Sequence, residues 1–266
     1  MRNGTEFETV VITGAGNGIG RALALKYSET AETIILFGRS PENLENTRTL
    51  CQNMSRRSNP RIFAYSVDQS DPQQAFLEYS AFLKSFPAAD LVIANAGLAR
   101  GAPDNAPTED LSATITQINV NFLGSAALVE ACLPKMLERK KGHVALMSSL
   151  AALAPMPYAA GYTASKAALN GYGSALRASL QSKGLNVSLI LPGFVETDME
   201  EALTGIKPFK VSAERAAEII CNNLKKGKAF ISFPLPMAFL ALLGHVAPSS
   251  FYDYCVTRWL LRVRNS

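Results

Sequence analysis

Short apolar runs alternate with longer amphipathic stretches along most of the chain. The runs are rich in Val, Ile, Leu and Phe and end at Gly, Asn, Ser or Pro, which is typical of strands buried on both faces. We predict strands at 7–13, 33–38, 61–67, 90–95, 142–148, 185–191 and 228–233, with helices in the gaps. Because such units cross over right-handed, the pattern predicts an α/β fold: a doubly wound seven-stranded parallel sheet with helices on both faces.

Nothing in the composition argues for a second globular domain or for disorder. Hydrophobic residues make up 48% of the 266 residues and charged residues 18%, and we find no repeat, linker or long charge block. We expect one domain over 1–233, with 234–266 as an apolar C-terminal helical extension. The net charge of +4 is small and scattered, so we expect no nucleic-acid partner.

Cysteine and histidine usage narrows the chemistry. Cys51, Cys132, Cys221 and Cys255 lie far apart without a C-x-x-C pair, which favours a reducing compartment over disulfides or zinc. The chain has two histidines and no G-x-S-x-G elbow, so we expect no metal site and no Ser-His-Asp hydrolase. Residues 1–8 are mostly polar and do not resemble a signal peptide, so we expect a cytoplasmic protein.

A glycine-rich turn follows the first predicted strand. GAGNGIG places Gly14, Gly16, Gly18 and Gly20 ahead of the helical stretch RALALKYSE, and Ile19 stands where strict G-x-G-x-x-G has its last glycine. Glycines let the backbone approach a pyrophosphate, and the amides at a helix start favour its charge. The turn therefore predicts a Rossmann-like dinucleotide site.

The end of the second predicted strand bears on the choice of dinucleotide. TIILFGRS (33–40) ends at the distance from the glycines where an NAD-specific protein carries an acid for the ribose hydroxyl. Arg39 stands there instead, and a guanidinium suits a 2′-phosphate. Glu42 pulls the other way, so NADP(H) is favoured and NAD(H) is the alternative.

Three residues in the second half of the chain suit carbonyl chemistry. Tyr162 and Lys166 in YTASK are four apart, hence neighbours on a helix face, so the ammonium is expected to lower the pKa of the phenol. Ser149 ends the apolar run HVALMSS, where its hydroxyl can donate to the same oxygen that Tyr162 protonates.

Taken together, these motifs resemble the short-chain dehydrogenase/reductase family over residues 7–230. TGAGNGIG (13–20) is similar to the family's TGxxxGxG element, ANAG (94–97) to its NAG motif, and LPGFVETDM (191–199) to the loop after its sixth strand. The resemblance implies that Asp68 meets the adenine and that the NAG run has a structural role beside the cofactor. It also implies that Asn121 holds a water that relays protons through Lys166, with Asn119 as the competing candidate.

The expected catalytic residues are thus Asn121, Ser149, Tyr162 and Lys166. The expected cofactor-binding residues are Gly14, Gly16, Asn17, Gly18, Ile19, Gly20, Arg39, Asp68, Asn95, Ala96, Gly97, Tyr162, Lys166, Pro192, Gly193, Val195 and Thr197. The activity implied is hydride transfer between NADP(H) and a lipophilic ketone or aldehyde, with Tyr162 as general acid/base. The alternatives are an NAD-dependent hydroxysteroid or hydroxyacyl dehydrogenase working oxidatively, a non-catalytic NADP(H)-binding scaffold or sensor, and a lipid-surface binding protein.

The last predicted segment, 235–266, is more apolar than a finished domain needs. From Phe251 onward apolar residues recur at helical spacing with Arg258, Arg262 and Arg264 between or beside them. Three interpretations stay open: packing on the domain or a partner subunit, peripheral contact with an anionic membrane, and a lid over the substrate. Phe209, Phe233, Met237 and Phe239 are candidates to line a lipophilic pocket. By family analogy, the helical stretches 108–139 and 160–183 predict a homodimer or homotetramer.

Overall fold

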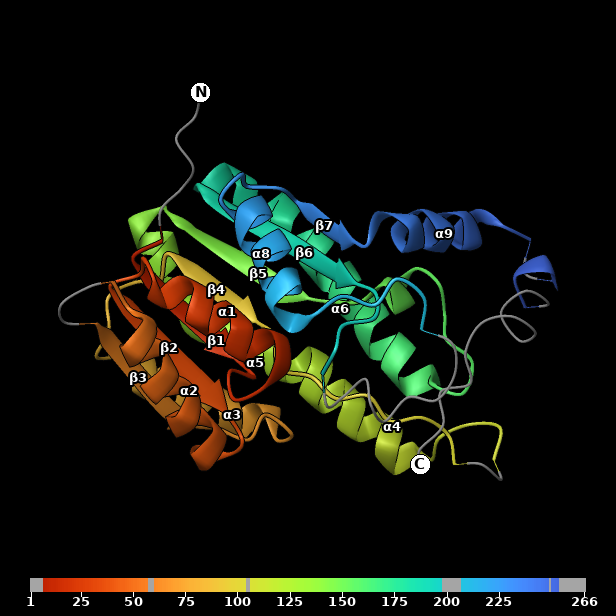
Figure 1. The fold of residues 1–266 in the computed structure, drawn as a ribbon, viewed down its shortest axis with the longest axis horizontal. Helices are drawn as coiled ribbons and strands as arrows, with labels where there is room; N and C mark the ends of the chain where they lie inside the picture. The colour runs from red at the N-terminus through yellow and green to blue at the C-terminus, as the bar shows by residue number, and fades with distance from the viewer. Residues whose placement is uncertain (1–6, 57–59, 104–105, 198–206, 249, 254–266) are drawn as a thin grey trace.

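The fold is a single parallel sheet wrapped by helices (Figure 1). The computed structural model describes residues 7–56, 60–103, 106–197, 207–248 and 250–253. Seven strands lie in the order β3-β2-β1-β4-β5-β6-β7. They are β1 (Thr9–Thr13), β2 (Thr33–Gly38), β3 (Arg61–Ser66), β4 (Leu91–Ala94), β5 (Gly142–Met147), β6 (Leu185–Pro192) and β7 (Phe230–Phe233). Each predicted strand overlaps one of these, and the predicted α/β class is confirmed.

The order of the strands reverses between β1 and β4. The chain runs outward from β1 through β2 to β3, then returns so that β4 pairs with the other edge of β1, with Val10 opposite Leu91. From β4 it runs outward again to β7. In doubly wound sheets ligands bind outside the carboxyl ends of the strands at this switch point.

Helices cover both faces because successive strand residues point to opposite sides. Val10 and Ile12 pack toward α1 (Gly18–Ser28), α2 (Pro41–Met54) and α8 (Ala213–Leu224). Val11 packs in the second core with α3 (Pro72–Leu83), α5 (Gly124–Arg139) and α6 (Ala160–Leu180). The strands are therefore enclosed on both faces, which explains their almost uninterrupted apolar character.

The predicted helical stretch 108–139 forms α4 (Leu111–Ile118), a π-helical turn η1 (Asn119–Leu123) and α5. By length and composition this run, Leu111–Arg139, is the one helix among the described residues that is apolar enough to cross a membrane. More than half of its apolar window is buried, and α5 packs on α3 while α4 packs on α6. The run is therefore placed as a core helix.

The helix after β7, α9 (Leu235–Val246), projects beyond β7 at one end of the molecule (Figure 1). It belongs to the segment predicted as a helical extension. The apolar residues expected at helical spacing from Phe251 onward are Tyr252, Val256, Trp259, Leu260 and Val263; of these, only Tyr252 is described. The three arginines of the tail also lie outside the described residues.

Candidate functional site

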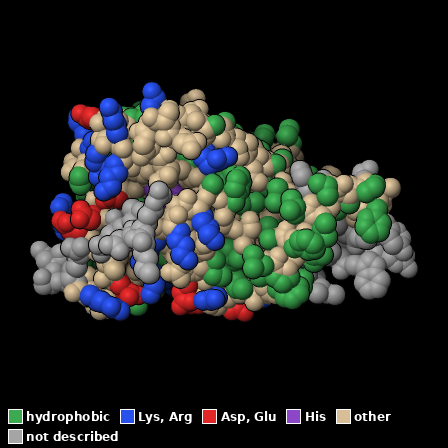
Figure 2. Space-filling view, turned by 90° about the horizontal axis from the view of Figure 1, so that it is seen from above, with side chains coloured by type: hydrophobic (Ala, Val, Ile, Leu, Met, Phe, Trp, Pro, Cys, Tyr) green, Lys and Arg blue, Asp and Glu red, His purple; other side chains and the backbone are tan. Residues whose placement is uncertain are grey.

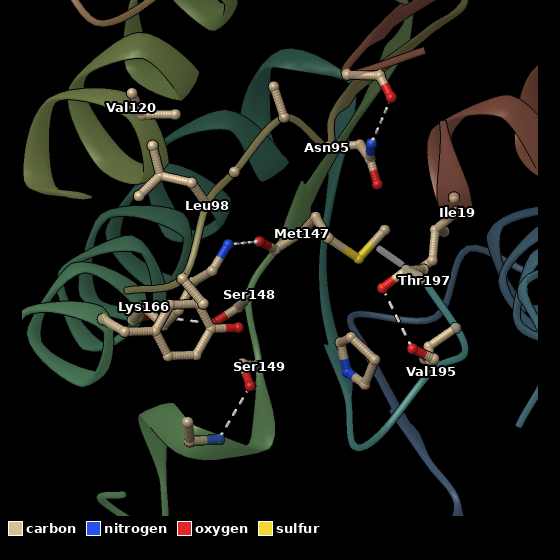
Figure 3. A pocket seen from close by; sticks show the side chains of 18 of the residues that line it. Ile19, Asn95, Leu98, Val120, Met147, Ser148, Ser149, Lys166, Val195 and Thr197 are labelled. Carbon is tan, nitrogen blue, oxygen red and sulfur yellow. Dashed lines mark hydrogen bonds between the residues drawn. The ribbon is translucent and has the colours of Figure 1, made fainter. Parts of the chain in front are cut away.

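A cavity of about 670 Å³ lies at the carboxyl ends of the strands, at the switch point. Its walls come from the segments after β1, β2, β3, β4, β5 and β6 and from α6 and α9. Of the residues predicted to bind cofactor or act in catalysis, Gly20 and Asn121 do not line the cavity, whereas the rest do. Figure 3 shows Lys166 and Ser149 on one side of this space and Ile19, Val195 and Thr197 on the other.

The glycine turn between β1 and α1 needs its glycines for space and for conformation. Gly14 and Gly18 have φ of +64° and +52°, in the left-handed region. A Cβ at Gly20 would collide with the carbonyl oxygen of Gly14, so Gly20 supports the turn by allowing the helix to pack closely against it. Arg21 donates to the carbonyl oxygen of Gly16 at 2.6 and 2.9 Å and holds the turn from outside.

The same turn fits a pyrophosphate. The first turn of α1 carries no acidic residue, so no carboxylate there would neutralise the helix dipole or repel a bound phosphate. A Cβ at Gly18 would lie 2.8 Å from Cγ2 of Thr197, so the loop after β6 closes tightly over the glycines. These residues fit the phosphates of a dinucleotide.

Asn95 ties β4 to this turn. Its side chain donates to the carbonyl oxygens of Thr13 and Gly14 at 3.0 and 3.3 Å, and the hydroxyl of Thr13 accepts from the amides of Asn95 and Ala96. These bonds engage both N–H groups of the Asn95 side chain and connect the end of β4 to the glycine turn.

Arg39 lies at the far end of the cavity, where β2 passes into α2. Its side chain is exposed, and its neighbours Ser40 and Asn43 also line the cavity. The Ser40 hydroxyl accepts from the amide of Asn43 and caps α2. Glu42 is exposed in the first turn of α2 and is not among the lining residues. Asp68 lines the cavity from the loop after β3 and accepts from the amide of Ser70 at 2.9 Å.

Lys166 is almost fully buried beneath the cavity floor. Its ammonium donates to the carbonyl oxygen of Met147 at 2.8 Å and lies 5.8 Å from the centre of the Tyr162 ring (Figure 3). Burial lowers the pKa of Lys166 from 10.5 to about 8. In the cofactor-free protein, the Lys166 ammonium is therefore expected to lose its proton at mildly alkaline pH.

The pKa of Tyr162 runs against the sequence-based expectation. Burial raises it above 10, and the hydrogen bond with Ser149 lowers it only in part. The expectation that Lys166 lowers this pKa is therefore wrong for this structure. The ammonium lies on the ring side and bonds to Met147 rather than to the phenol oxygen.

Ser149 sits where β5 gives way to a short 3-10 helix, η2 (Leu150–Ala152). Its hydroxyl accepts from the amide of Ala151 at 3.1 Å, which fixes the side chain at the tip of the strand. This places the hydroxyl beside Tyr162 from a different element. A donor from a strand tip and a phenol from a helix thus converge on one point.

Asn121 lies behind the cavity wall in the π-helical turn. Its amide group donates to the carbonyl oxygen of Leu98 and the hydroxyl of Ser165, both at 2.9 Å, and accepts from the amide of Leu98 at 2.7 Å. A Cβ at Gly97 would meet both Oδ1 of Asn121 and Nζ of Lys166, at 3.1 and 3.3 Å. Asn119, in contrast, bonds to the carbonyl oxygen of Ser70 on the exposed side of the turn.

The part of the cavity beyond Ser149 and Tyr162 is apolar. Its walls come from the segments 98–99 and 150–159, from α9 and from Tyr252 beyond it; they include Leu98, Leu150, Ala154, Met156, Met237, Leu240, Ala241 and Tyr252. The hydroxyl of Tyr252 is already bonded to the carbonyl oxygen of Pro155 at 2.7 Å. Of the four candidates for pocket lining, Met237 lines the cavity; Phe233 is buried in the core, and Phe209 and Phe239 are exposed.

Sequence analysis missed Glu109, which organises the start of α6. Its buried carboxylate accepts from the amides of Ala160 and Gly161, while Ala159 provides no side-chain cap. Gln117 donates to the same carboxylate at 3.5 Å and accepts from the amide of Arg100. Because Glu109 and the two amides lie 51 and 52 residues apart in sequence, no local signal marks this contact. Within the described residues, no group of His, Cys, Asp or Glu side chains is placed to hold a metal ion.

Comparison with known proteins agrees with this geometry. A family model described as short chain dehydrogenase matches residues 8–205. An uncharacterized oxidoreductase of Myxococcus xanthus is 31% identical over 252 residues, which cover 95% of this chain and 97% of that protein.

Solved structures share the fold. A short-chain dehydrogenase/reductase of Burkholderia phymatum in complex with NAD superposes with a TM-score of 0.79 at 23% identity, over 92% of this chain and 95% of that one. A short-chain dehydrogenase of Sphingobium yanoikuyae in complex with NADPH gives 0.77 at 20% identity, over 94% and 95%.

Proposed function

The chain belongs to the short-chain dehydrogenase family of oxidoreductases, and we propose that it reduces a lipophilic ketone or aldehyde with NADPH. The observation that carries this proposal is the placement of Tyr162, Ser149 and Lys166 where a polar dinucleotide cleft meets an apolar pocket. A carbonyl carbon in that pocket would face the nicotinamide end of the cleft, with its oxygen toward the phenol.

The preference for NADPH rests on the residues around the adenosine end of the cleft. The guanidinium of Arg39 stands next to the start of α2, where Ser40 and Asn43 add polar groups to the wall. A phosphate on the ribose would gain a cation and the positive end of a helix dipole. Related folds hold NAD in the Burkholderia protein and NADPH in the Sphingobium protein, so the fold admits both, and we propose that Arg39 selects NADPH in this chain.

Each side chain has one task in the proposed reaction. The bound nicotinamide supplies the hydride. Tyr162 gives its proton to the carbonyl oxygen, and the raised pKa of its phenol keeps that proton in place until the oxygen becomes basic. Ser149 donates to the same oxygen as its charge grows. Lys166, beside the ring of Tyr162, would hold the ribose of the bound cofactor, and Asn121 fixes the loop at Leu98.

The substrate class follows from the lining of the pocket. Among the described residues beyond Tyr162, no Asp, Glu, Lys or Arg side chain lines the apolar part, and the hydroxyl of Tyr252 there is engaged by the carbonyl oxygen of Pro155. A charged substrate would lose its hydration there without gaining a partner. We therefore assign the pocket to an uncharged, mainly hydrocarbon ketone or aldehyde. The reverse reaction, NAD-dependent oxidation of a hydroxysteroid or hydroxyacyl group, is the second candidate because Glu42 lies three residues from Arg39.

The remaining parts of the proposal concern the assembly. We propose one catalytic domain over 1–233 with 234–266 as an appended segment, a cytoplasmic protein, and a homodimer or homotetramer built on the α4–α5 and α6 helices. Sedimentation velocity of the purified protein tests the oligomer, and a monomer at micromolar concentration would contradict it.

The decisive experiment is fluorescence-detected binding of NADPH and NADH to the wild type, Arg39→Asp and Arg56→Asp. Arg56 is a matched control because the same charge change falls on an exposed side chain paired with Glu29, away from the cavity. We expect Arg39→Asp to weaken NADPH at least tenfold and to leave or improve NADH, with Arg56→Asp like the wild type. No binding of either cofactor would overturn the reductase; equal affinities that Arg39→Asp does not change would overturn the NADPH preference.

A further inference from the structure

We propose that α9 is a membrane-docking helix: its outward face rests in the surface of an anionic lipid membrane, from which the enzyme draws its substrate. Leu235, Phe239, Leu242 and Val246 recur at helical spacing and fall on one side of α9. They are 54–77% exposed, and Leu243 beside them is 47% exposed. Figure 2 shows hydrophobic side chains gathered at the end of the molecule where α9 lies.

The opposite side of α9 faces the cavity and packs against the rest of the protein. Met237 and Ala241 line the cavity, and Ala241 is buried. Just beyond α9, the Tyr252 ring packs over Gly244 and its hydroxyl bonds to Pro155, which fixes the helix to the loop after β5. Rotating α9 would bury the outward face only by exposing the inward one. The outward face therefore needs a partner outside this chain's described core.

Charge identifies that partner as lipid. Between Lys228 and Asp253 the sequence has no Asp, Glu, Lys or Arg, whereas the 13 residues after Asp253 include Arg258, Arg262 and Arg264 and no acid. Lys207 and Lys210 lie within two residues, in sequence, of Pro208, which lines the cavity. An uncharged apolar face that is followed along the chain by three arginines and no acid suits acyl chains beneath anionic headgroups.

The length of the helix decides how it would lie. Twelve residues reach about 18 Å, short of the ~30 Å hydrocarbon core, so α9 lies along the surface rather than across it. Leu240 lines the cavity and is also 56% exposed, so the cavity reaches the surface beside α9. A hydrocarbon ketone dissolved in the membrane would then enter without crossing water; this step rests on the proposed function, whereas docking does not.

The test is flotation of the full chain with vesicles of phosphatidylcholine alone or mixed with phosphatidylglycerol. Phe239→Gln combined with Leu242→Gln makes the outward face polar without touching the cavity lining. The matched control, Leu50→Gln combined with Leu77→Gln, removes two exposed leucines from α2 and α3. We expect the wild type and the control to float with the mixed vesicles, and the bound fraction of the α9 variant to fall at least tenfold.

Docking would be overturned by a wild type that floats with neither vesicle, or by equal flotation of both double variants. A change in sedimentation coefficient without lipid, confined to the α9 variant, would assign the face to a second copy and also overturn it. NADPH binding should be the same in all three proteins, which shows that they are folded. If none of them bound NADPH while flotation persisted, the proposed function would fail and docking would stand.

Substrate delivery has its own readout. We expect the α9 variant to lose at least tenfold in kcat/KM for a long-chain ketone carried in vesicles, and to keep its kcat/KM for a short water-soluble ketone. Equal effects on both ketones would contradict delivery from the membrane.

Discussion

The carboxylate of Glu109 accepts a hydrogen bond from the backbone amide of Gly161, the residue immediately before Tyr162. It accepts a second from Ala160 at 3.1 Å, so a buried charge from outside α6 caps the helix that carries both Tyr162 and Lys166. Glu109 is therefore a positioning residue: it touches the helix start, and the helix start places the phenol.

We expect Glu109→Gln to lower kcat at least tenfold while the Kd for NADPH changes less than threefold. An amide offers one acceptor oxygen and no charge, so the first turn of α6 loosens by about 1–3 kcal/mol. Glu214→Gln is the matched control, because Glu214 is an exposed carboxylate in the first turn of α8. Steady-state kinetics and cofactor titration separate the two effects; equal losses in kcat and cofactor affinity would indicate general unfolding instead.

Replacing Tyr162 by Phe keeps the ring and removes the proton donor. We expect kcat to fall by about 10²–10⁴, the range for general acid catalysis, with NADPH binding nearly unchanged. Tyr172→Phe on the same helix serves as the control, since Tyr172 lies outside the cavity lining. Turnover of Tyr162→Phe within fivefold of the wild type would rule out Tyr162 as the acid.

His143 makes stability depend on pH. It is buried with Nε2 2.7 Å from the hydroxyl of Ser188, which donates to the carbonyl oxygen of Lys228, and burial lowers its pKa from 6.5 to about 4. Between pH 6.5 and pH 4, the unfolded chain therefore binds a proton at His143, whereas the folded chain does not. The free energy of unfolding falls as the pH drops below about 6.5.

Between pH 7 and pH 5 this site alone is expected to cost about 2 kcal/mol. Urea unfolding of the wild type and of His143→Gln at pH 7 and pH 5 gives the change in the free energy of unfolding with pH for each protein. The contribution of His143 is the difference between these two changes. Parallel pH dependences for the two proteins would show that His143 does not titrate in this way.

Two glycines predict opposite outcomes for the same substitution. Gly20→Ala places a methyl group on the carbonyl oxygen of Gly14 and is expected to abolish NADPH binding or folding. Gly171→Ala, inside α6 with open space around its Cβ, is expected to raise stability by about 0.5–1 kcal/mol because alanine loses less backbone entropy. Thermal unfolding and cofactor titration of both variants check this; a functional Gly20→Ala protein would show that the turn can widen.

The sequence by itself determined the strands and the identity of the polar residues at their ends. Apolar runs such as VVIT and TIILF have one stable place, inside a sheet covered on both sides, so the parallel α/β fold follows from them. The glycine turn is equally local, because positive φ and close backbone approach are properties of Gly14 and Gly18 themselves. Motifs of this kind can be predicted from sequence because they depend only on residues that are close together in the chain.

Only the tertiary structure decided what depends on partners distant in the chain. The pKa of Tyr162 rises because burial outweighs the help from Ser149, and neighbouring positions on a helix did not bring Lys166 to its oxygen. Glu109 accepts a hydrogen bond from Ala160 at the start of α6, 51 residues away in sequence, and the side chain of Asn121 is hydrogen-bonded to the backbone of Leu98. The exposed side of α9 likewise becomes visible only once its other side is seen to line the cavity, because an apolar helix has the same sequence pattern whether protein or lipid covers it.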